Sequence, residues 1–333
     1  MRESRMSISH LIADSKFNLA DLDCIGVRSA RGNSSLRLGH YVDMSIDGGD
    51  NVELKQVLSR LILDYVETFR ENITHYHPHD SLQLAPLGEV SLVTYLDNRA
   101  QAPYDYDENQ GFDAAVYGFP EGLDNEEPTL YFMNVTSATP HRRFSSASAY
   151  IPASWPEVNG YGLYISLVKR WCEWIRPSYG TAGLSVVFNE GQESLEDRLT
   201  AFPLIKRFIG LDMPESSRWY SIMNRQNQRS IRTINWLTII DETFINVLGG
   251  LQSLRNSLTE DCLIHPFEGG IIIQAGARPV LGDINLGLSP PAYKSVAHAL
   301  KSIRFENYPR PLLDAPAPLD SMEETLKWIR RFD

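Results

Sequence analysis

The chain has 333 residues, of which 43% are hydrophobic and 22% charged, and its formal charge is −11 at pH 7. The length allows one large domain or two lobes, and the composition, which contains no low-complexity tract, excludes a disordered chain. The excess of acids argues against nucleic-acid binding, because a phosphate backbone requires clustered lysines and arginines, and it suits a basic protein partner.

We expect the protein to stay in the cytoplasm. The apolar residues between Ile8 and Leu19 are interrupted by polar and charged ones, which is not the pattern of a signal peptide, and no stretch approaches the ~18 apolar residues of a membrane span. The three cysteines, Cys24, Cys172 and Cys262, form no C-x-x-C pair, so we expect reduced thiols rather than a disulfide framework or a cysteine-rich metal site.

The first part of the chain predicts two short strands followed by a long helix. Residues 22–27 and 36–44 are strand-like around a turn at 31–33, and a glycine-rich turn at 47–50 leads into the helix. The apolar residues of the helix recur at intervals of three and four, so it should cover one face of a sheet. These residues are Leu54, Val57, Leu58, Leu61, Ile62, Tyr65, Val66, Phe69 and Ile73.

Three histidines, His75, His77 and His79, follow this helix. Alternate histidines on a strand share a face and could bind zinc, but Pro78 interrupts the strand and no acid–histidine motif accompanies them. We therefore expect an exposed polar loop here and no metal site.

The segment from Tyr104 to Glu127 follows a predicted strand at 90–96 and has the most uneven charge of the chain. No lysine or arginine lies between Arg99 and Arg142, and all the charged residues in that interval are acids. The acids are Asp105, Asp107, Glu108, Asp113, Glu121, Asp124, Glu126 and Glu127, and the interleaved aromatic residues are Tyr104, Tyr106, Phe112, Tyr117 and Phe119. Prolines and glycines predict loops with at most one short strand.

Two interpretations of this segment stay open. A run of acids is most often a solvated loop. Alternatively, the acids form the rim of a binding surface and the tyrosines anchor the partner, since aromatic side chains bury much area at a low entropic cost. In the second case the partner-binding residues are the eight acids together with Tyr104, Tyr106 and Tyr117.

The second half of the chain alternates predicted strands and single helices. The strands are residues 129–135, 144–150, 184–188 and 231–240, and the helices are residues 164–175, 244–258 and 321–332, the last opened by a capping box from Ser321 to Glu324. Gly249 and Gly250 cost the helix at 244–258 about 2 kcal/mol relative to alanines, which predicts close packing against a neighbour. The whole pattern predicts an α+β fold with mixed, mostly antiparallel sheets packed by single helices, rather than a doubly wound parallel sheet.

The region from Glu268 to Phe305 predicts a hairpin that leads into a helix. A β-branched strand at 271–273 follows a diglycine, Pro279 or Gly282 bends the chain back, and the helix begins at Ser289-Pro290.

Around this region the sequence carries a pattern of tryptophan, glycine and Asp-Asn positions. Its residues are Asn235-Trp236-Leu237, Leu248-Gly249-Gly250-Leu251, Gln274-Ala275-Gly276, Pro279, Gly282-Asp283-Ile284-Asn285, Tyr293, Leu300-Lys301, Arg304, Trp328 and Arg331-Phe332-Asp333. This pattern, which is clearest over roughly the last third of the chain, resembles the family of bacterial type VI secretion immunity proteins that guard against VRR-Nuc nucleases, toxins of the restriction-endonuclease fold. None of these residues has an obvious chemical role, so the pattern indicates architecture. We expect one α+β domain over residues 1–333 and leave open a division into two lobes, of which the later one (about 220–333) carries the pattern.

No catalytic motif is recognisable. The sequence has no G-x-S-x-G elbow, no P-loop, no H-E-x-x-H helix and no G-x-G-x-x-G after a strand, so we expect no enzyme activity, no cofactor and no metal. Asp283 and Asn285 could ligate a cation, but an Asx turn explains them better. The resemblance implies a protein that neutralises a cognate nuclease toxin by occluding its DNA-binding or active-site surface, without binding nucleic acid or a membrane. Two alternatives stay open: a hydrolase or transferase with a scattered active site, and a small-molecule binding module with a pocket near Asp283.

Overall fold

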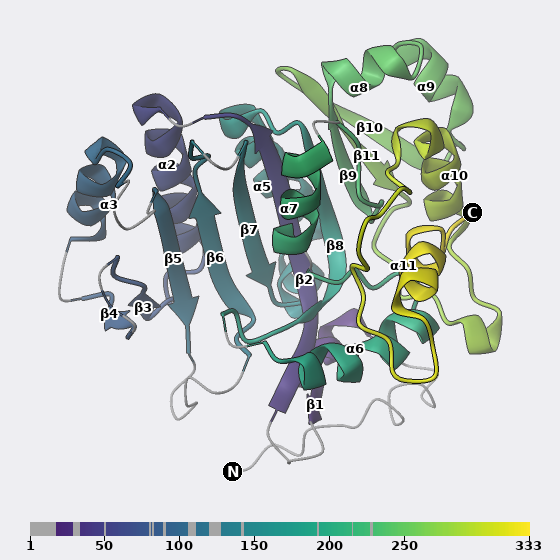
Figure 1. Cartoon of the computed structure of the whole chain (residues 1–333), viewed down its shortest axis with the longest axis horizontal. Coiled ribbons are helices and arrows are strands. Elements are labelled where there is room, and N and C mark those ends of the chain that lie inside the picture. Colours follow the sequence, from purple (N-terminus) through teal and green to yellow (C-terminus); the bar gives the residue numbers. More distant parts are fainter. Residues whose placement is uncertain are drawn as a thin grey trace.

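The structure is a computed structural model that describes residues 18–28, 34–49, 51–79, 81, 83–88, 91–105, 111–119, 128–140, 143–191, 193–214, 216–226 and 229–333. Within these residues eleven strands form one sheet in the order β10-β11-β9-β8-β2-β7-β6-β5-β3-β4, with β1 paired to β2 (Figure 1). All pairings between these strands are antiparallel. The α+β fold with antiparallel pairing is therefore confirmed.

The elements alternate along the chain as runs of strands and single helices. The strands are β1 (Gly26–Arg28), β2 (Ser34–Asp47), β3 (His75–Tyr76), β4 (Ala85–Pro86), β5 (Asp113–Gly118), β6 (Tyr131–Thr136), β7 (Phe144–Ile151), β8 (Tyr179–Val187), β9 (Leu237–Asp241), β10 (Cys262–Phe267) and β11 (Gly270–Ala275). The helices are η1 (Leu19–Cys24), α2 (Val52–Thr68), α3 (Leu92–Gln101), α4 (Ser154–Asn159), α5 (Tyr161–Ile175), α6 (Leu195–Arg207), α7 (Ser216–Gln226), α8 (Glu242–Val247), α9 (Leu251–Ser257), η2 (Ile284–Leu286), α10 (Pro291–Ala299), η3 (Lys301–Ile303) and α11 (Ser321–Ile329). None of the helices in the described residues is long and apolar enough to span a membrane.

One face of the sheet is covered by α2 and α5. The predicted apolar face of α2 is confirmed, because Leu58, Leu61, Ile62 and Tyr65 are completely buried. They share a core cluster with alternate residues of the strands beneath, such as Met133 of β6. The period of two along each strand sends these residues to the helices and their neighbours to the opposite face.

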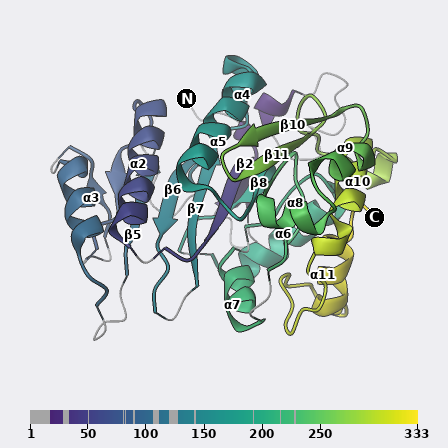
Figure 2. The ribbon, with the colours of Figure 1, turned by 90° about the horizontal axis from the view of Figure 1, so that it is seen from above.

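The opposite face is covered over only part of its width. Figure 2 shows α7 and α11 on that side, and a second core cluster containing Trp219 and Trp328 joins them to β2, β8 and α6 (Figure 2). Within the described residues no helix covers β5 and β6 on that side (Figure 1). In the described residues the two faces of the sheet are therefore covered unequally.

Residues 92–96 do not belong to a strand as the sequence predicted. They begin α3, whose first turn is capped by the Ser91 hydroxyl, which accepts a hydrogen bond from the Thr94 N–H at 3.3 Å. The β-branched residues favoured a strand, but Leu96 and Ala100, four residues apart, supply a buried helical stripe.

The single helix predicted at 244–258 is two helices, α8 and α9. Gly249 and Gly250 separate them with φ of +86° and +89°. A Cβ atom at Gly250 would meet nothing within 4 Å, so the predicted close packing is wrong. The two glycines are needed for backbone conformation, because side chains strongly disfavour positive φ.

Three local details near the C-terminus also differ from the sequence predictions. The hairpin partner of β11 is β10, which precedes it, whereas residues 279–290 form a loop. No side chain caps α10, so Ser289 does not have that role. The cap of α11 is Asp320, one residue before the predicted Ser321, and its carboxylate accepts from the Glu323 N–H at 2.8 Å.

Candidate interaction surface

Strand β5 brings Asp113 and Tyr117, two of the predicted partner-binding residues, to the same face of the sheet. They lie four residues apart on a strand, and the intervening Ala114 and Val116 are buried beneath α2. Asp113 and Tyr117 therefore point to the side that no described helix covers at β5. Both side chains are half-buried.

The neighbouring strands extend this face with small polar side chains. Asp113 lies opposite Thr136, which lies opposite Ser146, and Asn134 lies opposite Ser148. We call Asp113, Ala115, Tyr117, Asn134, Thr136, Ser146 and Ser148 the open sheet face. Except for Ala115, which is buried, these residues are half-buried. Most of these side chains are short and polar, so they project little from the sheet and can form hydrogen bonds. Polar residues are common on the solvent side of an antiparallel sheet.

Tyr117 is the half-buried member of a row of aromatic rings that crosses the sheet. Its ring centroid lies 5.0 Å from that of Phe132, which lies 5.6 Å from Tyr150, and Tyr150 lies 5.3 Å from Tyr41. Phe119 stacks on Tyr117 with an interplanar angle of 7°. All the rings except Tyr117 are buried. Such packing restricts the Tyr117 rotamers, so the ring would lose little entropy on binding a partner.

A half-buried carboxylate lies beside this row. The Tyr150 hydroxyl donates a hydrogen bond to Glu190, in the loop after β8, and burial raises the pKa of Glu190 to about 7. Burial, with the negative charges of Glu190 and Asp113, raises the pKa of Tyr117 to about 12. Tyr117 therefore presents a neutral hydroxyl that can donate and accept at physiological pH.

The other predicted residues are only partly placed. Asp105 is exposed, and Tyr104 is half-buried near the start of β5, where a Cβ atom on Gly111 would lie 3.7 Å from the Tyr104 ring. The remaining candidates lie outside the described residues; these are Tyr106, Asp107, Glu108, Glu121, Asp124, Glu126 and Glu127. The sequence analysis missed the serines of β7, although their alternation with alanines in the order Phe-Ser-Ser-Ala-Ser-Ala was a signal for a polar strand face.

The histidines after α2 lie at the edge of this half of the sheet. His75 is in β3, and its Nδ1 is 2.8 Å from the Thr74 hydroxyl oxygen. His79 Nδ1 is 3.8 Å from an Asp113 carboxylate oxygen. In the described parts of the chain no three His, Cys, Asp or Glu side chains converge as a metal site would require.

Asp283, the other candidate from the sequence, lines a cavity of about 970 Å³. Its carboxylate accepts hydrogen bonds from the Arg207 guanidinium, at 2.9 Å for the shortest, and from the Asn285 N–H at 3.0 Å. The hydrogen bonds from Arg207 hold the pKa of Asp283 below its usual range. Asp283 thus forms the expected Asx turn and a salt bridge, which occupy the oxygens that a cation would need.

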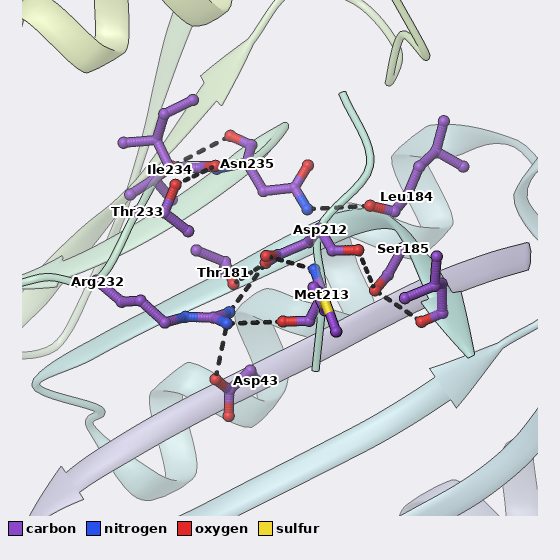
Figure 3. A network of polar contacts seen from close by, with 12 residues as sticks. Asp43, Thr181, Leu184, Ser185, Asp212, Met213, Arg232, Thr233, Ile234 and Asn235 are labelled. Carbon is purple, nitrogen blue, oxygen red and sulfur yellow. Dashed lines mark hydrogen bonds and ion pairs between the residues drawn. The ribbon is translucent and has the colours of Figure 1, made fainter. Parts of the chain in front are cut away.

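A buried polar network lies on the covered part of the same face (Figure 3). Arg232 is completely buried and donates to Asp212 at 3.0 Å and to the Met213 carbonyl at 2.7 Å. Asp43 of β2 lies 3.9 Å from the same guanidinium, and the Thr181 hydroxyl donates to Asp212 at 3.3 Å. Because these groups are shut off from solvent, the network joins segments of the fold and offers no access to a substrate.

Residues of the family pattern have a similar structural role. The Asn235 side chain donates to the Leu184 carbonyl at 3.3 Å and accepts from the Trp236 N–H at 2.7 Å. The Trp236 indole donates to the Gly276 carbonyl at 3.0 Å. These bonds tie β8, β9 and the end of β11 together, as expected of residues that specify architecture.

The fold is similar to that of a solved structure. The structure superposes on the Pseudomonas aeruginosa T6SS protein PA0821 with a TM-score of 0.79, over 92% of this chain and 87% of that chain, at 16% sequence identity. At this identity the likeness shows a shared fold. None of the curated proteins matches the sequence.

The family follows from the sequence itself. Residues 88–332 match the TsiV family, described as type VI immunity for VRR-NUC, and the chain belongs to this family. The match begins far upstream of the last third in which the resemblance was clearest. It includes all eight acids of the 105–127 segment and the whole open sheet face.

Proposed function

We propose that this protein is a non-catalytic inhibitor that acts in the cytoplasm, where it binds its cognate VRR-Nuc toxin and keeps the toxin from DNA. The observation that carries the proposal is the position of β5. This strand lies inside the acidic segment of residues 105–127 and presents Asp113 and Tyr117 on a sheet face that no helix of the described residues covers. Membership of the immunity family supports a nuclease partner.

The charge of the segment suits such a partner. A nuclease must hold a phosphate backbone, so its substrate groove needs positive charge, and acidic side chains can occupy the same groove or its approach. Acids at the rim mainly raise the association rate, whereas a packed aromatic side chain mainly slows dissociation. We therefore propose that the eight acids steer the toxin and that Tyr117 anchors it, with Tyr104 and Tyr106 as further anchors. The protein itself binds no nucleic acid.

Surface plasmon resonance against the toxin at several salt concentrations separates the two roles. Converting all eight acids of the 105–127 segment to their amides should slow association about 10-fold or more at low salt and flatten its salt dependence. A matched control converts eight exposed acids elsewhere to Gln, which changes the net charge equally. The control residues are Glu53, Glu67, Glu71, Glu173, Glu242, Glu260, Glu268 and Glu323. Equal rate constants for the two variants would show that only net charge matters and that the segment is a solvated loop.

The anchor is tested separately. Tyr117→Ala should weaken binding by about 2 kcal/mol, roughly a 30-fold faster dissociation, with little change in association. Tyr117→Phe is the control because it keeps the ring and removes only the hydroxyl. If Tyr117→Ala leaves dissociation unchanged, the open sheet face is not part of the interface.

The absence of catalysis is also testable. Purified protein should show no turnover with esterase, phosphatase, nuclease or nucleotide substrates, with or without divalent metals. Turnover that co-purifies with the protein and disappears in Asp283→Ala would instead establish an enzyme with a site at the cavity.

A further inference from the structure

A second surface, far from β5 along the sheet, carries a cluster of exposed apolar side chains. Val280 is 43% exposed, Ile284 52%, Leu286 59% and Leu288 57%. These four are a third of the twelve large hydrophobic side chains that are exposed in the described residues, yet they lie within nine consecutive positions. Single exposed apolar residues are ordinary, but a cluster on one loop indicates a contact surface. We call residues 280–288 the apolar loop.

The apolar loop is braced in one conformation. Asp283 and Leu288 exchange two backbone hydrogen bonds, each 2.9 Å long, and Arg207 holds the Asp283 carboxylate. The Gly210 N–H donates to the Leu281 carbonyl at 2.6 Å, and a Cβ atom on Gly210 would lie only 1.8 Å from the Val280 carbonyl oxygen. The exposed side chains are thus presented from a rigid base, which lowers the entropic cost of binding.

The cavity of about 970 Å³ lies directly beside this loop. The loop forms one wall through Leu286 and Leu288, and Leu22, Ile25 and Phe208 contribute to the lining. The same patch of surface therefore carries both projecting apolar side chains and an apolar hollow.

The charge of the patch differs from that of the rest of the chain. From Gly269 to Tyr293 the only charged residues are Arg278 and Asp283, and Asp283 is paired with Arg207. The chain as a whole carries −11, so two copies repel each other at most approaches. With Asp261, which also lines the cavity, the patch holds two acids against Arg207 and Arg278. Its charges cancel, so a second copy meets little repulsion here and a basic partner gains little attraction.

From these observations we propose that two copies of the chain associate through this patch as a symmetric dimer, each apolar loop entering the cavity of the other copy. A two-fold contact requires a self-complementary surface, and a projection next to a hollow on one patch meets that requirement. The proposal does not depend on how the toxin is bound. It leaves β5 and the open sheet face outside the dimer contact.

Sedimentation equilibrium tests the dimer. The mass should rise from that of the 37.7 kDa chain toward twice that value as the protein concentration increases from about 1 to about 200 µM. Leu286→Asp should weaken the association about 30-fold or more, because it places a charge in the centre of an apolar contact. Val93→Asp is the matched control, since Val93 is 50% exposed on α3, at the opposite end of the sheet from the patch (Figure 1). A wild-type protein that stays monomeric to the highest concentration, or a Leu286→Asp variant that associates as well as Val93→Asp, overturns the proposal.

Measuring toxin binding by the same variants shows whether the patch contacts a second copy of the chain or the toxin. Because Leu286 is more than half exposed, the variant should fold, and an unchanged circular dichroism spectrum checks this. A monomeric Leu286→Asp variant that binds the toxin with wild-type affinity supports the dimer. If the variant keeps its self-association but loses toxin affinity, the apolar loop belongs to the toxin interface and the dimer proposal is wrong.

Discussion

At the scale of single residues, the structure separates buried side chains that hold the fold together from half-buried side chains on the open sheet face. Arg232 and Asp212 are completely buried and make their polar contacts with each other and with nearby groups. Asp113 and Tyr117 are half-buried on a face that no helix covers in the part of the chain that the structure describes. The sequence alone does not distinguish such acids, because burial depends on strands that are distant in the chain.

Removing one partner of the buried pair should be costly. Asp212→Ala leaves the Arg232 guanidinium buried with only the more distant Asp43 carboxylate, and we expect a loss of about 3–5 kcal/mol in the free energy of unfolding. The double variant Asp212→Leu/Arg232→Met removes both charges of the pair. The buried Asp43 carboxylate keeps its hydrogen bond from the Tyr220 hydroxyl, so this variant should lose less than Asp212→Ala. Urea denaturation measures both. Glu67→Ala, which breaks the exposed pair with Arg70, is the control and should cost under about 1 kcal/mol. Equal losses for the two single variants would contradict the structural role of the network.

Glu190 gives the protein a defined pH dependence. Burial raises its pKa from 4.5 to about 7 in the folded chain, so the folded state binds more protons than the unfolded state between these values. Its contribution to stability is therefore greatest below pH 4.5 and is lost as the pH rises through 7. Glu190→Gln should raise the melting temperature at pH 8 relative to wild type and change it little at pH 5. The same shift at both pH values would show that the effect is not titration of Glu190.

At the scale of elements, local patterns predicted the structure where one periodicity was strong. The apolar repeat of α2 and the β-branched run of β11 were sufficient. Local patterns gave wrong predictions where a helix cap or a backbone dihedral angle determined the structure. Examples are Ser91, which caps α3, and Gly249-Gly250, which separate α8 from α9. The polar face of β5–β7 was predicted only in part, since pairing brings together strands that a single sequence does not show to be neighbours.

The role of Gly250 can be tested against the original packing hypothesis. Its φ of +89° and ψ of 167° are accessible almost only to glycine, so Gly250→Ala should lower the free energy of unfolding by about 1–3 kcal/mol. Gly250→Leu should cost about the same, because the space around the position is open. A clearly larger loss for Leu would restore the packing explanation. Gly162, in α5 and also in open space, is the control, and Gly162→Ala should stabilise the protein by about 0.5–1 kcal/mol.

At the scale of the whole molecule, one sheet extends from β10 to β4, with β2 near its middle. Acidic sequence concentrates around β5, and a nearly neutral apolar patch lies beyond the opposite half of the sheet. This arrangement allows two independent contacts on one chain. The sequence showed the acidic segment directly, but the apolar loop and its cavity became recognisable only when side-chain exposure was known.

We propose that residues 1–333 form one folding unit rather than two lobes. β2 pairs with β7 on one side and with β8 on the other. If the two halves of the sheet were separate, one of these two strand pairings would be lost. Calorimetry at low protein concentration should show one transition with calorimetric and van't Hoff enthalpies in a ratio of about 1. Two resolved transitions would favour separate lobes.

The position of β2 in the chain also bears on how the protein is made. Tyr41 pairs with Tyr150 and with Gly183, roughly 110 and 140 residues later in the sequence. During translation the central strand emerges early and waits for both neighbours, and closing such long loops slows the search for the native pairing. A ribosome that stalls before β8 is complete releases a chain in which β2 keeps an unpaired edge, which is a template for aggregation. Truncation products of this protein should therefore accumulate in the insoluble fraction rather than give partial protection.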